Sequence, residues 1–309
     1  MQNQFDVEKS AVLMEALPFI QKFRGQTFVI KYGGSAMEDD HLIERLLKDF
    51  VFLEAVGINP VLVHGGGKAI TQRMREAGQV PRFVNGLRVT DSVAIKIVED
   101  VLDGSIRPKI VETMKEFGGR AEGFSGRDVF KAKRLAPQID RKNLIDVGFV
   151  GKVTSLELSG VSEAIDREVV PVISPIAQTE DEVILNVNAD IAASAVASAL
   201  KASKMIYVSD VMGVMRDVKD RGSLIPAVSR ANVAQLIKDG IIGGGMVPKL
   251  LSAVDAINAG VGKVHLNRRT DSTRASIGSI YRGRHWDRIG ALRVLHLMQA
   301  RGVLLVLPK

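Results

Sequence analysis

Two short apolar segments that run directly into glycines place the strongest constraint on how this chain can fold. Residues 27–32 (TFVIKY) and 59–64 (NPVLVH) have the β-branched composition of strands buried inside a sheet. The segment between them, 39–56, carries one apolar face at helical spacing, and Gly57 provides its stop. A strand, a helix and a strand in this order predict two parallel strands whose carboxyl ends meet at one edge of a sheet.

The same alternation continues along the chain. Residues 169–173 and 205–209 are predicted strands, and an alanine-rich helix is expected between them over 189–201. The last predicted strand is 263–266. This repetition predicts an α/β fold in which a mainly parallel sheet is covered by helices on both sides.

Two further helices are expected at about 91–102 and 107–117, with Asp91 as a suitable N-cap for the first. In open parallel sheets the ligand binds beyond the carboxyl ends of the strands. Those ends carry glycines, lysine and aspartate in this sequence, so we expect the functional site there.

The net charge of +7 is not spread evenly over the chain. Residues 267–309 contain nine Lys/Arg and two Asp/Glu, so residues 1–266 hold equal numbers of both signs. A body without a basic surplus argues against a nucleic-acid-binding protein. The lack of cysteine excludes disulfides and thiolate nucleophiles, and no apolar run is long enough to span a membrane. We therefore expect a cytoplasmic protein with neither a membrane association nor a resident metal site.

Glycine-rich turns after the first two strands are candidates for chemistry. Lys31 is followed closely by Gly33 and Gly34, and residues 64–68 read HGGGK. Glycines let backbone N–H groups approach an anion, and a lysine adds positive charge. Taken alone, each motif is equally compatible with an ordinary turn beside a solvated lysine.

Three later segments add polar side chains: 85–91 (NGLRVTD), 186–190 (NVNAD) and 243–249 (GGGMVPK). Arg88 in the first could hold a carboxylate in a bidentate pair, although a lone loop arginine is more often simply exposed. The second is also an ordinary helix start. Together the motifs provide cations, glycine turns, an amide and a carboxylate, but no nucleophile. Such a set suits phosphoryl transfer, in which positioning and charge stabilisation carry most of the catalysis.

The order of the motifs KYGGSAM, VHGGG, NGLRVTD, DVGFVGKV, NVNAD, SDVMGV and GGMVPK resembles that of the acetylglutamate kinases in the amino acid kinase family. The resemblance extends from about residue 17 to residue 266. It implies a three-layer αβα sandwich with an open, mainly parallel central sheet. It further implies an N-terminal lobe (1–180) with the acetylglutamate site and oligomer contacts, and a C-terminal ATP lobe (181–266).

The resemblance implies an enzyme that uses ATP with Mg²⁺ to phosphorylate the γ-carboxylate of N-acetyl-L-glutamate, giving N-acetyl-L-glutamyl 5-phosphate for arginine biosynthesis. A homo-oligomer, dimer or hexamer, is expected, because the helix with 17–23 (LPFIQKF) is similar to the arm of arginine-inhibited hexameric members. Two alternatives remain open: a catalytically impaired subunit that binds acetylglutamate, and a sister amino acid kinase.

Residue roles follow from the resemblance. Lys31 and Lys249 would stabilise the charge of the transferring phosphoryl group, and Asp190 would orient both lysines. Acetylglutamate would be held by Gly66, Gly67, Arg88 and Asn186. ATP would be held by Gly33, Gly34, Ser209, Asp210, Gly213 and Gly245.

The resemblance stops after Leu266. The family continues with a DGR turn, a leucine-rich helix and a final strand, whereas residues 267–309 form a basic segment without a clear amphipathic period. With permitted codons, residues 267–289 read one nucleotide along can give a DGR turn and a leucine-rich segment. We therefore interpret 267–309 as the product of a frameshift near Leu266. A divergent basic tail is the alternative.

The coding nucleotides test this hypothesis directly. Reading the gene across the codons of residues 266–289 in the other frames should give DGR and a leucine-rich helix. If no frame encodes them, the tail is genuine and the hypothesis is wrong. If the tail is translated as written, we expect weak ATP binding and loss of arginine inhibition, because the family's terminal segment completes the ATP lobe.

Overall fold

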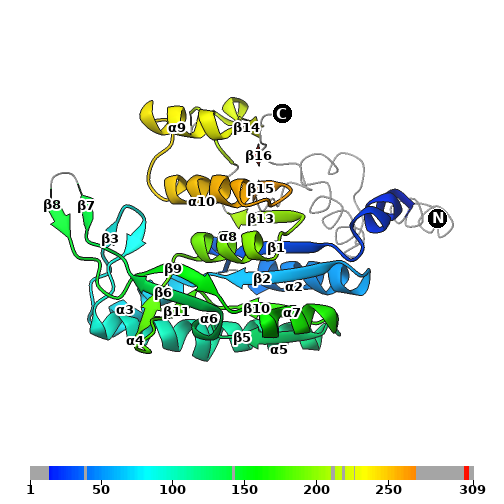
Figure 1. Ribbon diagram of the computed structural model, residues 1–309, viewed down its shortest axis with the longest axis horizontal. Helices are drawn as coiled ribbons and strands as arrows, with labels where there is room; N and C mark the ends of the chain where they lie inside the picture. Colours follow the sequence, from blue (N-terminus) through cyan, green and yellow to red (C-terminus); the bar gives the residue numbers. More distant parts are fainter. Residues whose placement is uncertain are drawn as a thin grey trace.

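The computed structural model describes residues 14–37, 40–140, 143–209, 213–217, 220–225, 227–268 and 303–305. An eight-stranded sheet runs through the molecule in the order β14-β16-β15-β13-β1-β2-β10-β5 (Figure 1). Its strands are β1 (Thr27–Tyr32), β2 (Asn59–His64), β5 (Ala121–Phe124), β10 (Val170–Ile173), β13 (Lys204–Ser209), β14 (Ala227–Val228), β15 (Val264–Arg268) and β16 (Val303–Leu305).

The central strands pair in parallel, as the strand and helix alternation predicted. β1 lies between β2 and β13, so that Lys31 is level with Val63 on one side and with Tyr207 on the other. The pairing of β15 with β16 is antiparallel. Within residues 267–309, which we interpret as out of frame, the structure describes the last two residues of β15 and the three residues of β16. The other residues of this segment lie outside the described part of the chain.

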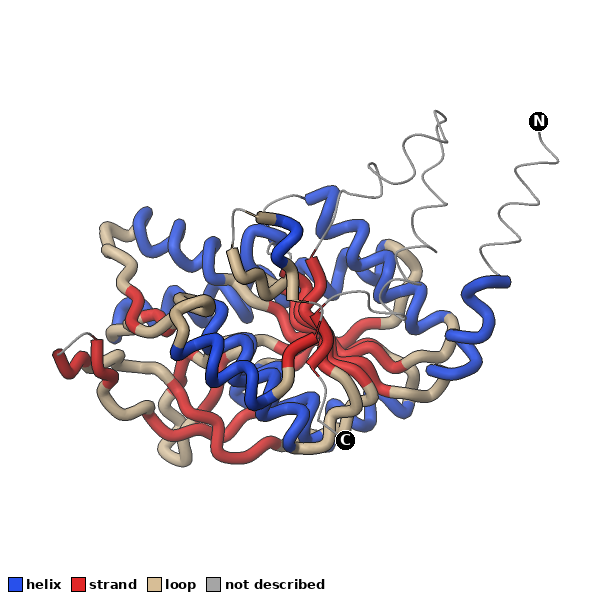
Figure 2. The backbone as a smooth tube through the Cα atoms, turned by 90° about the horizontal axis from the view of Figure 1, so that it is seen from above, coloured by secondary structure: helices blue, strands red, loops and turns tan. Residues whose placement is uncertain are grey.

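Helices cover both faces of this sheet, which confirms the three-layer fold (Figure 2). Phe28, Ile30 and Tyr32 of β1 pack on one face against α2 and α5, while Val29 packs on the other face with α8 and α10. The helices are α2 (Asp40–Ala55), α3 (Gly67–Glu76), α4 (Ser92–Glu99), α5 (Arg107–Glu116), α6 (Gly126–Val129), α7 (Ser159–Asp166), α8 (Ala189–Ala199), α9 (Arg230–Lys238), α10 (Met246–Asn258) and the short 3₁₀ turns η1 (Gly34–Met37) and η3 (Arg221–Ser223).

A second, smaller sheet and two hairpins were not predicted from the sequence. The sheet contains β12 (Ile184–Asn186), β11 (Ile176–Gln178), β6 (Phe130–Arg134) and β9 (Gly151–Leu156) in that order. The hairpins are β3 (Phe83–Val84) with β4 (Leu87–Arg88), and β7 (Gln138–Asp140) with β8 (Asn143–Ile145). Both hairpins project on one side of the molecule (Figure 1).

The two helices expected near 91–102 and 107–117 are joined by a π-helical segment, η2 (Asp100–Ile106). Asp91 caps the first helix as predicted, because its carboxylate accepts from the N–H groups of Val93 and Ala94. Pro108 has no N–H to donate and its ring would clash with the preceding turn of an α-helix. The wider π turn accommodates this ring, and the Arg107 N–H bonds the Leu102 carbonyl five residues back.

His64 ends β2 in a fully buried position. Its Nδ1–H donates to the carbonyl oxygen of Gly65 at 3.0 Å. Burial lowers the pKa of His64 to about 4, with a smaller opposing effect from the carboxylate of Asp103. The imidazole is therefore neutral in the folded protein near pH 7.

We predict that His64 makes the protein less stable as the pH falls from about 6.5 to about 4. In this window the unfolded chain binds a proton at His64 and the folded chain does not, so acid favours unfolding. The full effect is roughly 3 kcal/mol. Urea unfolding at several pH values measures it.

His64→Leu should flatten this pH dependence because it removes the titrating group. His41→Leu, on the exposed side of α2, is the control for the loss of a histidine. An unchanged slope for His64→Leu would contradict the prediction.

Candidate active site

The site is built where the carboxyl ends of β1 and β2 meet. A methyl group added at Gly33 would lie 3.3 Å from the Cα of Gly65, and one added at Gly65 would lie 3.3 Å from the Cα of Gly33. The two glycine turns therefore touch backbone to backbone. Lys31 leaves β1 just before this contact, on the sheet face covered by α8 and α10, and is buried.

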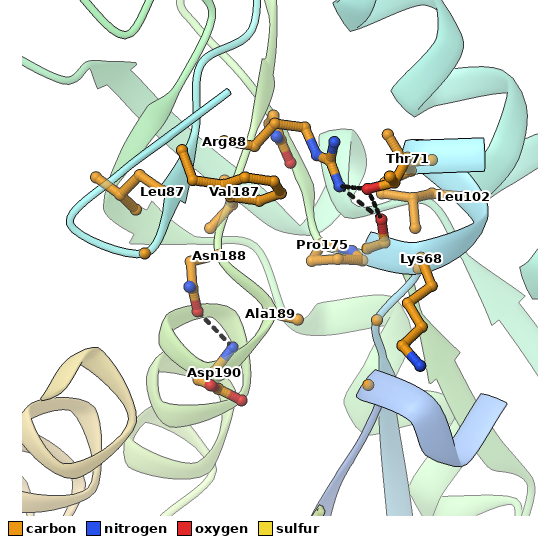
Figure 3. A pocket seen from close by; sticks show the side chains of 18 of the residues that line it. Lys68, Thr71, Leu87, Arg88, Leu102, Pro175, Val187, Asn188, Ala189 and Asp190 are labelled. Atoms are coloured by element: carbon orange, nitrogen blue, oxygen red, sulfur yellow. Dashed lines mark hydrogen bonds between the residues drawn. The ribbon is translucent and has the colours of Figure 1, made fainter. Parts of the chain in front are cut away.

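Asp190 lies between the two predicted catalytic lysines. Its carboxylate is 2.9 Å from the Lys31 ammonium and 4.0 Å from that of Lys249. The first turn of α8 holds Asp190 because the side chain of Asn188 caps the helix and accepts from the Asp190 N–H at 2.8 Å (Figure 3). All three charged side chains are about 10% exposed, so their attraction is weakly screened by water.

The ring of Tyr207, in β13, contacts the side chain of Lys249. The Lys249 ammonium lies 5.7 Å from the ring centroid, within the range of a cation–π contact. The Tyr207 hydroxyl shares a 2.8 Å hydrogen bond with Ser252 one turn further along α10. Burial raises the pKa of Tyr207, so this hydroxyl keeps its proton.

Arg88 approaches the same site from the β3–β4 hairpin. Its Nη2 donates to the Gly67 carbonyl at 2.5 Å and to the Thr71 hydroxyl at 2.8 Å (Figure 3). The guanidinium also lies 4.7 Å from the ring centroid of Phe83. Only 7% of the residue is exposed, and burial lowers the Arg88 pKa to about 10.

In the described part of the chain, no carboxylate forms an ion pair with Arg88. A buried cation whose neighbours are neutral is costly, and an anionic ligand would offset that cost. Asn186 joins this end of the site through its bond to Thr90, whose hydroxyl in turn bonds the Arg88 carbonyl. The arrangement therefore favours a carboxylate at the Arg88 end.

One cavity of about 320 Å³ connects the two ends, large enough for a small metabolite. Seven predicted residues line it: Lys31, Gly34, Gly66, Gly67, Arg88, Asn186 and Asp190. The other lining residues fall into two groups. Those that belong to motifs singled out from the sequence, but without an assigned role, are Gly65, Lys68, Gly86, Leu87, Val150, Val187, Asn188 and Ala189. Those that sequence reasoning missed are Ile70, Thr71, Phe83, Leu102 and Pro175. Of the missed residues, Thr71 could have been found, since it lies one helical turn after Gly67.

The other predicted residues do not line this cavity. Gly33 packs behind it, and Lys249 reaches Asp190 from α10. Ser209 ends β13, Gly213 is buried beyond that end, and Gly245 precedes α10. None of these three lines the cavity, and Asp210 lies outside the described residues.

Among the described residues, no group of three or more His, Asp or Glu side chains is arranged to hold a metal ion. In the same part of the chain, no helix combines the length and apolarity needed to cross a bilayer. Mg²⁺ commonly binds through substrate phosphates and waters with few protein ligands. The residues present are compatible with a magnesium ion that enters with a nucleotide.

Comparisons with known proteins agree with this geometry. The model of the amino acid kinase family matches residues 26–267. An acetylglutamate kinase of Akkermansia muciniphila is 48% identical over 84% of this chain and 88% of its own length. One from Pelotomaculum thermopropionicum is 45% identical over 84% of this chain and 90% of its own.

Solved structures agree on the fold. N-acetylglutamate synthase from Neisseria gonorrhoeae matches with a TM-score of 0.77 at 21% identity, over 97% of this chain and 64% of that one. Carbamate kinase from Giardia lamblia matches with a TM-score of 0.63 at 17% identity, over 92% of this chain and 99% of that one. From the matched residues and the close relatives, this chain belongs to the acetylglutamate kinases of the amino acid kinase family.

Proposed function

We propose that the protein transfers the γ-phosphoryl group of ATP to the γ-carboxylate of N-acetyl-L-glutamate, forming N-acetyl-L-glutamyl 5-phosphate in arginine biosynthesis. The observation that carries this proposal is one cavity with a buried arginine at one end and, at the other, Lys31 paired with an aspartate that Lys249 also approaches. The close relatives are named acetylglutamate kinases, which favours this reaction over that of a sister kinase.

At the acceptor end, Arg88 binds the α-carboxylate of acetylglutamate. Its Nη2 already bonds Gly67 and Thr71, which fixes the plane of the fork toward the cavity. Asn186 and the backbone of Gly66 and Gly67 add hydrogen-bonding groups along the acceptor. The acetyl group removes the charge from the amine, which suits a site lined by cations and neutral groups.

At the reacting end, Lys31 and Lys249 stabilise the negative charge on the transferring phosphoryl group. Asp190 holds both ammonium groups so that little reorganisation accompanies the reaction. The γ-carboxylate is ionised near pH 7 and attacks phosphorus without a general base. Mg²⁺ accompanies ATP and offsets the charge of its phosphates.

ATP approaches from the C-terminal lobe. Its phosphates lie over the glycine turn after β1, where the absence of side chains lets an anion approach the backbone, and its nucleoside contacts the segment that follows β13. The residues assigned to ATP are Gly33, Gly34, Ser209, Asp210, Gly213 and Gly245. We further propose that the protein is cytoplasmic and forms a homo-oligomer, either a dimer or a hexamer.

Acetylglutamate-dependent ADP release by the purified chain tests the reaction. Lys31→Ala and Lys249→Ala should each lower kcat on the order of 10²–10³-fold, because each removes a charge that stabilises the transition state. Asp190→Asn should lower kcat as well, since it keeps the side-chain shape but loses the attraction for both lysines.

Lys238→Ala, exposed on α9, controls for the loss of a lysine and should leave kcat unchanged. ADP release that does not depend on acetylglutamate would contradict the proposed acceptor. Full activity of the lysine variants would contradict the assigned roles.

Arg88→Lys should raise the KM for acetylglutamate while leaving the KM for ATP unchanged. A lysine keeps the charge but loses the planar fork, at a cost of about 1–3 kcal/mol, or roughly 5–150-fold in KM. Arg73→Lys, exposed on α3, is the matched control. Equal changes in both KM values would show that Arg88 does not bind the acceptor.

A further inference from the structure

Asp103 of η2 joins three separate parts of the chain. Its two carboxylate oxygens each accept a 2.5 Å hydrogen bond, one from the Ser125 hydroxyl and one from the Ser174 hydroxyl. The Arg107 guanidinium lies 3.6 Å away as a weaker ionic partner. Ser174 is fully buried and also accepts from the Gly126 N–H at 2.9 Å.

Asp103 and Ser174 each have one sequence neighbour that lines the active-site cavity. Leu102 precedes Asp103 and Pro175 follows Ser174, and both line the cavity near Arg88 (Figure 3). Leu102 also packs closely against Gly66, since a methyl group on Gly66 would lie 2.5 Å from its Cδ2. The hydrogen bond therefore connects two wall segments from η2 and from the end of β10.

Apolar side chains without hydrogen bonds would suffice at positions 103 and 174 if these residues only filled the core. A carboxylate is costly to bury, and here its cost is offset by two short bonds and one nearby cation. Asp103 and Leu102 both lie in the π segment that precedes Pro108, and Leu102 packs closely against Gly66. Unusual helix geometry of this kind often occurs at functional sites.

We infer that Asp103, acting through Ser174, is a positioning residue that sets the length of acceptor the cavity takes. This inference rests on the proposed function. The chain of an acyl amino acid spans the distance from Arg88 to Lys31, and the apolar walls at Leu102 and Pro175 contact its methylene groups. With the walls fixed, an acceptor one methylene shorter cannot reach the lysines while it keeps its bond to Arg88.

The test compares N-acetyl-L-glutamate with N-acetyl-L-aspartate as acceptors. Ser174→Ala removes the hydrogen bond between Asp103 and the segment that contains Pro175. It should raise the KM for acetylglutamate and reduce the preference for acetylglutamate over acetylaspartate, as a ratio of kcat/KM values, about tenfold. The KM for ATP should not change. Asp103→Asn replaces one of the two acceptor oxygens by an amide NH₂ group and should change the preference in the same direction. This variant is the test if Ser174→Ala does not fold.

Ser125→Ala is the matched control. It removes a bond of equal length to the same carboxylate, but residues 124–126 do not line the cavity. We expect a comparable loss of stability in urea unfolding without a change in acceptor preference. Equal effects of Ser125→Ala and Ser174→Ala on the preference, or none from Ser174→Ala and Asp103→Asn, would overturn the inference.

These outcomes are distinct from failure of the proposed function. If the unchanged chain releases no ADP with acetylglutamate, calorimetric binding of both acceptors to the chain and its variants measures the same preference. Acetylglutamate that neither binds nor turns over would contradict the function itself. Binding with an unaltered preference in the variants would contradict only the role of Asp103.

Discussion

The contact between the glycine turns after β1 and β2 is the constraint on which the rest of the site depends. Parallel pairing in register brings Tyr32 level with His64, so the residues that follow must share one small space. Gly33 and Gly65 approach so closely that a methyl group on either would crowd the backbone of the other at 3.3 Å. This close approach lets Lys31 and the amides of the second turn face the same cavity.

Charge in this cavity is arranged in two different ways. At the Asp190 end two cations share one carboxylate, so they are held in place while this group of three side chains stays positive. At the other end, Arg88 has only neutral hydrogen-bond partners and an aromatic ring in the described part of the chain. The first arrangement suits a group whose charge develops during reaction, and the second suits a ligand whose charge is permanent.

Much of this site followed from the sequence because parallel strands deliver the residues at their carboxyl ends to one edge. Lys31, Gly66, Arg88 and Asp190 were found from turns and motifs, and the structure brings them together. The two hairpins, and β11 and β12 of the small sheet, were missed because strands of two or three residues give too few alternations to detect. Leu102 and Pro175 were missed because their approach to the cavity involves a π turn and a partly buried carboxylate, which no local pattern encodes.

The place of β16 in the sheet has a consequence for the order of folding. Its three residues lie between β14 and β15, so in the described structure β14 has no other strand to pair with. β1 and β2 are separated by a single helix, whereas β14 pairs with a segment far along the chain. Because closing a longer loop costs more chain entropy, β14 is expected to join the sheet after β1 and β2 have paired.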